Sequence, residues 1–580
     1  MMISRAATAA LLLALGGCAT TGPRTAAAPV EVKLIAINDF HGNLEPPKQG
    51  VDAPRREEGS VRVPAGGAAW LASAIAKLRE ANPNNVVVSA GDMIGASPLV
   101  SAVFLDEPTI HAMNLIGVDF NAVGNHEFDK GREELLRMQK GGCEKHTARE
   151  PCAVEPFPGA RFSFLAANVL TESGSTLFPG HGIRSFGSGR GRVEVGFIGL
   201  TLKETPTLVT PAGVAGLAFA DEADTINALV PKLRAEGADA IVVLIHQGLS
   251  TKVGYNDKGC EGVDGDLLPI LARLDPAVDV VVSGHTHNAY VCDYGRIDPT
   301  RPILVTSAGR YGTLVTDIVL TIDPAAGRVT SKRADNLIVQ SEGYGNVAPT
   351  DRFPRYAPDP AVAALVRRYA DRAGPLANRV VGRLTAPATR ALSPSREMVL
   401  GDIIADAHLA ATRPSGAQIA FTNGFGVRAD LQPAADGSVT FGQLFAIQPF
   451  GNTLAVKSLT GRQLRALLEQ QFDSGSNTLT SPNMLLPSAN LRYAYDLSRP
   501  AGQRILDLEI DGTPVRDETV YRVAMNSFLA TGGDNFTVFR EGTDPAGGPL
   551  DLDALESYIA ASSPLTPPAA ERIRDVTPKP

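Results

Sequence analysis

The sequence of 580 residues lacks several features that mark particular classes of protein. It has no lysine and arginine cluster of the kind that binds nucleic acid, and its formal net charge is −8. We therefore expect no polynucleotide partner. An anionic substrate would need local positive charge from a metal ion or a few arginines. No internal repeat is visible. At 44% hydrophobic and 20% charged residues the composition is globular, and the length predicts two domains.

Cysteine is also scarce, with five residues in the chain and no C-x-x-C pair. Setting Cys18 aside leaves Cys143, Cys152, Cys260 and Cys292, and an even number in an exported chain suggests disulfides. Three pairings are possible. We favour Cys143–Cys152 and Cys260–Cys292, which close the shorter loops. A four-cysteine zinc site is the alternative, but zinc sites commonly contain a C-x-x-C pair.

The N-terminus reads as a processing segment. Arg5 is followed by a short apolar run, Ala9 to Leu15, which is too short to span a bilayer. The run ends in Leu15-Gly16-Gly17-Cys18, which resembles a bacterial lipobox with Cys18 as the lipidated residue. An ordinary signal peptide with a stray cysteine is the alternative. We expect residues 1–17 to be a lipoprotein signal peptide and 18–30 a tether. The protein would be anchored in the cell envelope, and Ala19 favours the outer membrane, facing the periplasm.

Five apolar runs of strand length each end in a cluster of polar residues. Continuous runs of valine, isoleucine and leucine are typical of strands buried on both faces. The runs are Val32 to Ile37, Val86 to Val88, Phe120 to Val123, Ile241 to Ile245 and Val278 to Val282. Helical patterns, such as Ala68 to Glu80 and Asp221 to Glu236, lie between them. The alternation predicts an α/β domain whose ligands collect beyond the carboxyl ends of the strands.

A second region begins near residue 380 and mixes a helix, Leu400 to Ala411, with several short strands. A probable helix, Pro360 to Arg372, precedes it and is our candidate for a hinge. The Pro-rich end of the chain is expected to be loose. The expected boundaries are 31–342 for the first domain, 343–379 for a linker with the hinge helix, 380–562 for the second domain and 563–580 for a loose tail.

The polar clusters hold a set of residues suited to metal ions. The candidates are Asp39, His41, Asp92, Asn125, His246, His285 and His287. Oxygen and imidazole ligands suit Mn²⁺, Zn²⁺, Fe or Mg²⁺, and a shared carboxylate can hold two such ions. Each residue alone could be a turn, a cap or a satisfied core histidine. Together they favour a metal centre, because five of the nine histidines lie in these clusters.

The clusters resemble those of the calcineurin-like metallophosphoesterases in type and in order. The matching pieces are Asp39-x-His41, Gly91-Asp92, Gly124-Asn125-His126-Glu127, His246 and Gly284-His285-x-His287. The resemblance implies a layered α/β/β/α metallophosphoesterase domain. It also implies that Asp39, His41, Asp92 and His287 hold one metal, and that Asp92, Asn125, His246 and His285 hold the other, with Asp92 bridging.

The resemblance further implies a catalytic pair beside the ligands. The residue matching His126 in the family is catalytic: it stabilises phosphoryl charge or protonates the leaving oxygen. Asp129 would orient His126. We expect a structural role for Glu127.

The second region resembles the C-terminal substrate domain of 5′-nucleotidases, an α+β domain smaller than the first. The segments that carry this resemblance surround Arg396, Asn423 to Arg428, Pro449 to Asn452 and Asn526 to Asp534. It implies that Phe450 and Phe528 sandwich a nucleobase, that Asp534 and Asn423 bind the nucleoside, and that Arg396 and Arg428 bind phosphate. Phe425 departs from the family, which usually has consecutive glycines there; it could reshape the pocket.

These observations predict an exported 5′-nucleotidase that uses two divalent metal ions to activate water and release phosphate from nucleotides. Two alternatives remain open. One is a hydrolase of 2′,3′-cyclic nucleotides or nucleotide sugars with the same metal core. The other is a lipoprotein that binds nucleotides without turnover.

Overall fold

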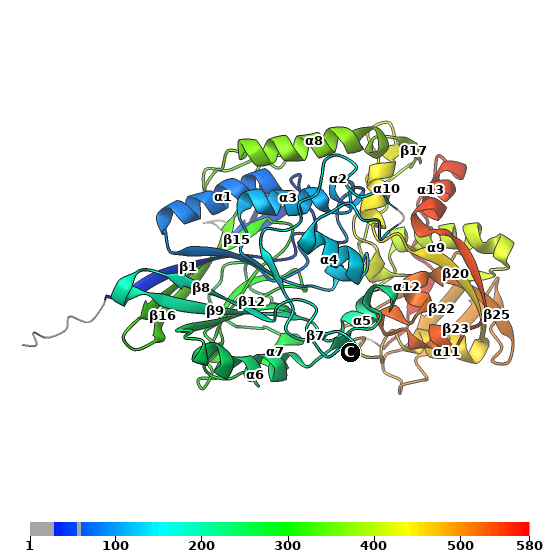
Figure 1. Ribbon diagram of the computed structural model, residues 1–580. Helices are drawn as coiled ribbons and strands as arrows, with labels where there is room; N and C mark the ends of the chain where they lie inside the picture. Colours follow the sequence, from blue (N-terminus) through cyan, green and yellow to red (C-terminus); the bar gives the residue numbers. More distant parts are fainter. Residues whose placement is uncertain (1–27, 55–59, 148, 210, 579–580) are drawn as a thin grey trace, which may run out of the picture.

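Two stacked six-stranded sheets, with helices on both outer faces, form the larger part of the molecule (Figure 1). The computed structural model describes residues 28–54, 60–147, 149–209 and 211–578. The expected signal peptide and lipid-attachment residue Cys18 lie outside these residues. Within the described residues, no helix combines the length and the apolar character needed to cross a membrane.

The first sheet is parallel on one side and antiparallel on the other. Strands β1, β4, β5 and β6 run parallel, and β15 and β16 extend the sheet antiparallel beyond β1. In spatial order its strands are β16 (Arg328–Ile338), β15 (Leu314–Asp323), β1 (Val30–Ile37), β4 (Asn85–Ser89), β5 (Phe120–Ala122) and β6 (Ser163–Leu165).

The second sheet has four parallel strands flanked by an antiparallel strand on each side. In spatial order its strands are β13 (Ala289–Asp293), β14 (Leu304–Ala308), β12 (Val280–Ser283), β11 (Ala240–His246), β9 (Val193–Thr201) and β8 (His181–Phe186). The five apolar runs of the sequence form β1, β4, β5, β11 and β12. Their carboxyl ends therefore meet at one edge of the paired sheets.

Alternate residues of each strand enter different layers of the core. In β4, Val86 and Val88 pack between the two sheets, whereas Val87 faces the helices α1 (Ala68–Ala81), α3 (Glu107–Ile116) and α8 (Pro360–Ala377). In β11, Val242 packs between the sheets and Val243 faces α6 (Glu222–Ala235) and α7 (Leu267–Leu271). These four layers confirm the predicted α/β/β/α arrangement.

The chain after residue 380 forms a second α+β unit, as predicted. Its five-stranded sheet has the order β21 (Leu485–Pro487), β18 (Ile419–Asn423), β25 (Val520–Asn526), β20 (Thr453–Thr460) and β26 (Thr543–Leu550). A four-stranded sheet has the order β24 (Thr513–Pro514), β23 (Ile505–Ile510), β22 (Leu491–Tyr495) and β27 (Ile573–Asp575). The main helices are α9 (Val399–Thr412), α10 (Phe441–Ile447), α11 (Gly461–Glu469) and α13 (Asp551–Ala561).

The expectation of a loose tail from residue 563 is wrong. Strand β27 pairs in parallel with β22, so the end of the chain completes a sheet. Arg572 is buried, its guanidinium donates to Asp406 at 2.7 Å, and its amide donates to Glu397 at 3.0 Å. The composition of the tail suggested disorder, but buried pairing with residues far away in the sequence decides its structure.

Helix α8 is longer than the predicted Pro360 to Arg372 and is firmly packed on the first unit. Tyr369 is fully buried and its ring lies 5.1 Å from that of Phe104. At its carboxyl end, Ala377 lies against Gly442 of α10, where a β-carbon would be 3.0 Å from the Ala377 carbonyl oxygen. Helix α8 thus connects the two units, and its role as a hinge stays a prediction.

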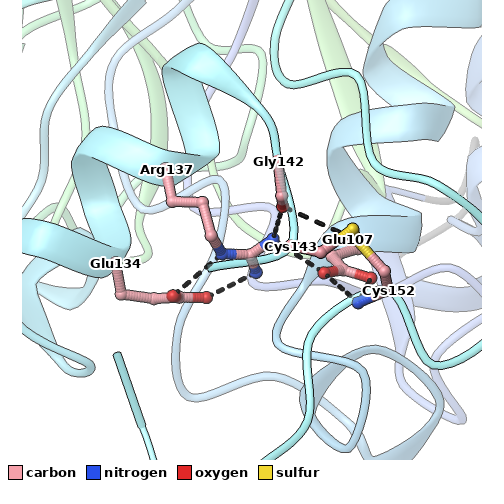
Figure 2. The surroundings of a disulfide bond; sticks show 6 residues. All are labelled: Glu107, Glu134, Arg137, Gly142, Cys143 and Cys152. Atoms are coloured by element: carbon pink, nitrogen blue, oxygen red, sulfur yellow. Dashed lines mark hydrogen bonds and ion pairs between the residues drawn. A yellow bond between two sulfur atoms is a disulfide. The ribbon is translucent and has the colours of Figure 1, made fainter. Parts of the chain in front are cut away.

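The two disulfides have the pairing favoured by the loop lengths, Cys143–Cys152 and Cys260–Cys292. Figure 2 shows the first of them above a buried ion-pair network. Arg137 lies between Glu134 and Glu107, with N–O distances of 2.6 and 2.8 Å, and also donates to the Gly142 carbonyl. Because Glu107 accepts the Cys152 amide as well, the network holds both ends of the disulfide-closed loop.

We predict that replacing Arg572 by methionine destabilises the protein far more than replacing Arg574. Arg572→Met removes a buried guanidinium, leaving the half-buried Asp406 without its ion-pair partner and the carboxylate of Asp402 without a neighbouring positive charge, which should cost about 3–5 kcal/mol of unfolding free energy. Arg574→Met is the control, because its ion pair with Asp507 is solvent-exposed and worth at most about 1 kcal/mol. Denaturant unfolding measures both values. Similar small losses in both variants would contradict the buried anchoring of the tail.

Candidate functional site

Two groups of potential metal ligands meet at the carboxyl edge of the paired sheets. Asp39, His41 and His287 form one group, and Asp92, His246 and His285 form the other; the ligand atoms of each group lie within 4.8 Å of one another. His246 is the last residue of the buried strand β11, and the other five lie in the loops that begin where β1, β4 and β12 end. The structure thus brings together six residues that the sequence pattern selected.

Asp92 connects the two groups. Its Oδ2 lies 2.9 Å from His246 Nε2 and 3.5 Å from His41 Nε2, so one carboxylate oxygen reaches both. Asn125 joins the second group through its Oδ1, which is 3.2 Å from His285 Nδ1. Asp92 thus lies between the two groups, and its role as a bridging ligand stays a prediction.

The buried donors fit divalent metal ions. The Nδ1 atoms of His41 and His246 each lie 2.8 Å from a backbone carbonyl, of Gly95 and Ala90 respectively, which turns both Nε2 atoms toward the centre. Such contacts fix the ring orientation of metal-binding histidines. His246 Nε2 is buried without a properly directed hydrogen bond, and His41 Nε2 faces His287 Nε2 at 3.1 Å. Unsatisfied and mutually opposed nitrogens of this kind are typical of a metal site.

The electrostatics of the site set the protonation states of the candidate ligands. Burial opposes ionisation of Asp92, but His246, His126 and His41 hold its pKa well below the usual value. Burial lowers the pKa of His285 to about 3, so its ring is neutral at neutral pH. Burial opposes protonation of His246 too, but the adjacent Asp92 raises its pKa to about 10, so metal binding there would displace a proton.

Five of the ligands have a left-handed backbone. The φ angles of Asp39, His41, Asp92, His285 and His287 lie between 46° and 70°. Residues other than glycine adopt this region rarely, because each such residue costs on the order of 1–3 kcal/mol of backbone strain. The close packing around Asp92 also requires that residue 124 be a glycine. A β-carbon on Gly124 would lie 2.2 Å from Asp92 Oδ1.

His126 and Asp129 lie next to the ligands and contact each other, as expected. His126 Nδ1 is 2.9 Å from Asp129 Oδ2, and the His126 amide donates to Asp92 Oδ1 at 2.9 Å. Burial lowers the pKa of His126, but the carboxylates of Asp129 and Asp92 outweigh it and raise that pKa above its usual value. The imidazole is therefore held by one carboxylate beside the metal ligands.

Glu127 has a larger role in the site than the sequence indicated. Its buried carboxylate accepts the backbone amides of Asp92 at 3.0 Å, Met93 at 2.8 Å and Gly124 at 2.6 Å. It thereby ties the loop after β4 to the loop after β5. Burial and the nearby charge of Asp92 raise the pKa of Glu127 to about 7. Because its partners are backbone groups, no residue pattern could have identified them.

Tyr311 is a second residue that the sequence reasoning missed. Its ring is edge-on to His41 and His287, with ring centroids 5.9 and 5.7 Å apart, and its amide donates to the Asp39 carbonyl at 2.7 Å. The sequence did contain a signal for Tyr311. The segment Gly309-Arg310-Tyr311-Gly312 directly follows the buried strand β14, just as the other polar clusters follow buried strands.

The second unit contributes residues directly to this centre. The ring of Phe450 stacks on His126 at a centroid distance of 5.7 Å and an angle of 17°. The guanidinium of Arg428 lies 5.9 Å from the Phe450 ring centre, and its charge lowers the pKa of His126, His41 and His287. Phe450, expected to clamp a base with Phe528, thus contacts the expected catalytic histidine in this structure.

The expected nucleoside contacts form a buried polar group. Asn423 Nδ2 donates to Asp534 Oδ2 at 2.7 Å, and burial raises the pKa of Asp534 to about 6. Phe528 lies against the same turn, since a β-carbon on Gly533 would be 2.5 Å from its ring. Helix α5 (Thr205–Leu208) of the first unit lies against the turn η7 (Gly533–Asn535) that carries Asp534.

Of the two arginines expected at the phosphate, Arg428 lies close to this centre, whereas Arg396 lies near Tyr495. Arg396 has a φ of 60°. Its positive charge acts to lower the pKa of Tyr495, the last residue of β22 in the four-stranded sheet. Arg390, which the sequence reasoning passed over, lies beside Arg428: its Nη1 donates to the Arg428 carbonyl at 3.3 Å. Burial and the charge of Arg428 lower the pKa of Arg390, and Arg310 adds to the effect. Three arginines therefore converge near the metal ligands.

Comparison with known proteins agrees with this geometry. Residues 32–289 match the calcineurin-like phosphoesterase family and residues 380–541 match the 5′-nucleotidase C-terminal domain. The chain is 31% identical to cell wall protein Lmo0130 of Listeria monocytogenes, over 93% of this chain and 68% of the relative. It is 27% identical to endonuclease YhcR of Bacillus subtilis over 91% of its own length, but spans only 40% of that relative. The crystal structure of a 5′-nucleotidase precursor from Thermus thermophilus superposes with a TM-score of 0.73 at 28% identity, covering 95% of this chain and all of the other.

We predict that Glu127→Gln weakens metal binding by roughly 10–100-fold, the usual cost of removing a supporting contact. The glutamine amide group would face backbone N–H donors and could accept from fewer of them. Titration calorimetry with Mn²⁺ on the metal-free protein measures the affinity. Glu133→Gln is the matched control, since Glu133 is exposed on α4 (Arg132–Lys140) and only pairs with Arg132. Equal affinities in both variants would contradict the role of Glu127 in joining the two loops.

Proposed function

We propose that this chain, which belongs to the 5′-nucleotidase family of calcineurin-like metallophosphoesterases, hydrolyses nucleotides to nucleoside and phosphate. The observation that carries the proposal is the position of Phe450 and Arg428. They belong to the nucleotidase-type second unit, yet they lie against His126 beside the candidate ligands of the first unit. A nucleotide bound by the second unit would therefore present its phosphate to the first.

We further propose that the protein is exported and held at the membrane by a lipid on Cys18. The two disulfides support export, because such bonds persist in oxidising compartments. The name of the Listeria relative, a cell wall protein, points the same way. The lipid anchor and its place in the outer membrane rest on the lipobox alone.

The proposed metal residues divide into two sets that share Asp92. Asp39, His41, Asp92 and His287 would hold one ion, and Asp92, Asn125, His246 and His285 the other, as Mn²⁺, Zn²⁺, Fe or Mg²⁺. Two such ions, when bound, polarise a phosphoryl group and make hydroxide available near neutral pH. The carboxylates of Asp129 and Asp92 raise the pKa of His126 above its usual value and so favour its protonated form. In our proposal His126 donates a proton to the leaving nucleoside oxygen or stabilises phosphoryl charge.

The residues of the second unit would bind the rest of the substrate. Arg428 and Arg390 are proposed to engage the phosphate, where a planar guanidinium can make two parallel hydrogen bonds. The role of Arg396 at the phosphate, which the motif comparison implied, stays a prediction. Phe450 and Phe528 would stack on the base and Asp534 would bind ribose hydroxyls with Asn423. Phe450 would have to leave His126 to reach a base, which fits a movement between the two units.

A different phosphoester substrate is the main alternative. The metal core would serve 2′,3′-cyclic nucleotides or nucleotide sugars equally well, and one relative is named an endonuclease. Binding without turnover is the other alternative, and the complete set of candidate ligands and the His126–Asp129 pair argue against it.

We expect hydrolysis of AMP and UMP in the presence of Mn²⁺ and none with a chelator. The experiment uses the chain without its first 27 residues and compares AMP, UMP, a 2′,3′-cyclic nucleotide, UDP-glucose and a simple sugar phosphate. Free phosphate and the organic product are measured by chromatography. Metal-dependent turnover restricted to the cyclic, sugar-linked or non-nucleotide substrates would retain the metal centre and refute the nucleotidase assignment.

Replacing His126 by glutamine should lower kcat about 10²–10⁴-fold, the usual range for a general acid or base. Mn²⁺ affinity should change little, because His126 is not in either ligand group. Asp129→Asn should show a smaller loss of the same kind. Asp224→Asn, an exposed carboxylate on α6, is the control and should keep full activity. Loss of metal binding in His126→Gln would assign this histidine to the metal instead.

A further inference from the structure

Phe425 is the most exposed of the large apolar side chains among the described residues, at 62% of its surface. It lies in the turn η6 (Gly424–Gly426), where it is the only side chain larger than a hydrogen atom. At this exposure the ring does not fill a pocket in the protein itself. A single exposed apolar residue is ordinary, so its meaning depends on what surrounds it.

The turn that carries Phe425 is part of the substrate-facing side of the second unit. At its start, Asn423 donates to Asp534 at 2.7 Å and accepts from Asn526 at 3.1 Å. At its end, Arg428 reaches the ring of Phe450 beside the metal ligands. Phe425 therefore lies on the chain segment between the expected ribose contacts and the expected base contact.

The backbone of this turn is held in place. A β-carbon on Gly426 would lie 2.8 Å from Asn423 Oδ1, so Asn423 packs directly on the turn. The Val427 amide donates to the Gly424 carbonyl at 3.2 Å, and the Val427 side chain is fully buried. The position from which the Phe425 ring projects is fixed, and only the ring itself is free to adjust to a ligand.

Two further exposed apolar residues lie on segments linked to this turn or to Asp534. A β-carbon on Gly424 would lie 3.8 Å from the Met398 methyl group, and Met398 is bridged through its backbone to Leu392, which is 57% exposed. Leu479, 42% exposed, lies two residues after Asn477, whose side chain donates to the Asp534 carbonyl. Three exposed apolar side chains thus come from segments that border one polar site, which is the usual composition of a ligand-binding rim.

We propose that Phe425 is a specificity-determining residue that extends the nucleobase site and gives the enzyme a preference for purine over pyrimidine nucleotides. This inference rests on the proposed function. A base that stacks between Phe450 and Phe528 needs only a single aromatic ring, and both purines and pyrimidines have one. A purine carries a second ring beyond the pyrimidine portion, and Phe425 offers an apolar surface that only the larger base covers.

The test compares kcat/KM for AMP and UMP in the wild-type protein, Phe425→Leu and Phe425→Tyr. We expect the wild type to favour AMP. Phe425→Leu should lower kcat/KM for AMP about fivefold or more through KM, the lower end of the effect of losing one base–aromatic contact. Its kcat/KM for UMP should change less than about twofold, and Phe425→Tyr, which keeps the planar ring, should behave as wild type.

Binding of adenosine and uridine to the chelator-treated protein, measured by calorimetry, provides a readout without catalysis. Phe425→Leu should weaken adenosine binding and leave uridine binding nearly unchanged. If the wild type fails to hydrolyse both nucleotides, the proposed function is wrong, and the nucleoside titrations still decide whether Phe425 selects purines. An equal loss for both bases, or a wild type without purine preference, would overturn the assignment of Phe425.

Discussion

The burial of Asp39 and Asp92 side by side is the constraint on which the rest of the structure depends. Neither carboxylate has more than 1% of its surface exposed, and an isolated charge at such depth would cost several kcal/mol. Compensation must come from neighbours. His246, whose pKa is raised to about 10, lies 2.9 Å from Asp92, and the imidazole nitrogens of His41 and His287, whose pKa values are lowered by burial, lie within 4 Å of the carboxylates. The left-handed φ angles of the ligands follow from the same constraint, since strands that end at one edge must turn sharply to aim their side chains at one point.

This compensation makes the candidate metal centre a property of the first unit, and in our proposal substrate choice belongs to the second. Glu127 fixes two ligand loops through backbone amides, so the centre cannot adjust one loop without the other. The second unit meets this rigid centre in a few places. Leu99 and Ala102 of α2 (Leu99–Ala102) pack into the core of the second unit, and Phe450 stacks on His126. Near the metal centre the two units therefore meet through the ring of Phe450, and α2 joins the first unit to the core of the second.

The sequence predicted the layers and the residues at the strand ends because both follow from local patterns. Buried strands are continuous apolar runs, and polar residues placed directly after five such runs have no packing explanation. Glu127 and the tail could not be read in this way. The partners of Glu127 are backbone groups, and β27 is held by residues more than 70 positions away in the sequence, so a Pro-rich composition was misleading. Arg390 was missed for a similar reason: motif context locates a loop, whereas the contact of Arg390 with the Arg428 carbonyl depends on how the loops fold together.

The contrast between the buried centre and the exposed rim also indicates where members of this family can diverge. A change at Asp92, His246 or Gly124 meets a buried charge or a contact of 2.2 Å and disturbs both ligand groups at once. A change at Phe425 alters an exposed ring on a turn whose backbone is held by other residues, so folding and metal binding remain unaffected. Relatives described as nucleotidase and as endonuclease can therefore share one metal centre. Their substrates would differ through exposed positions of the second unit, where a new side chain costs little stability and contacts the ligand directly.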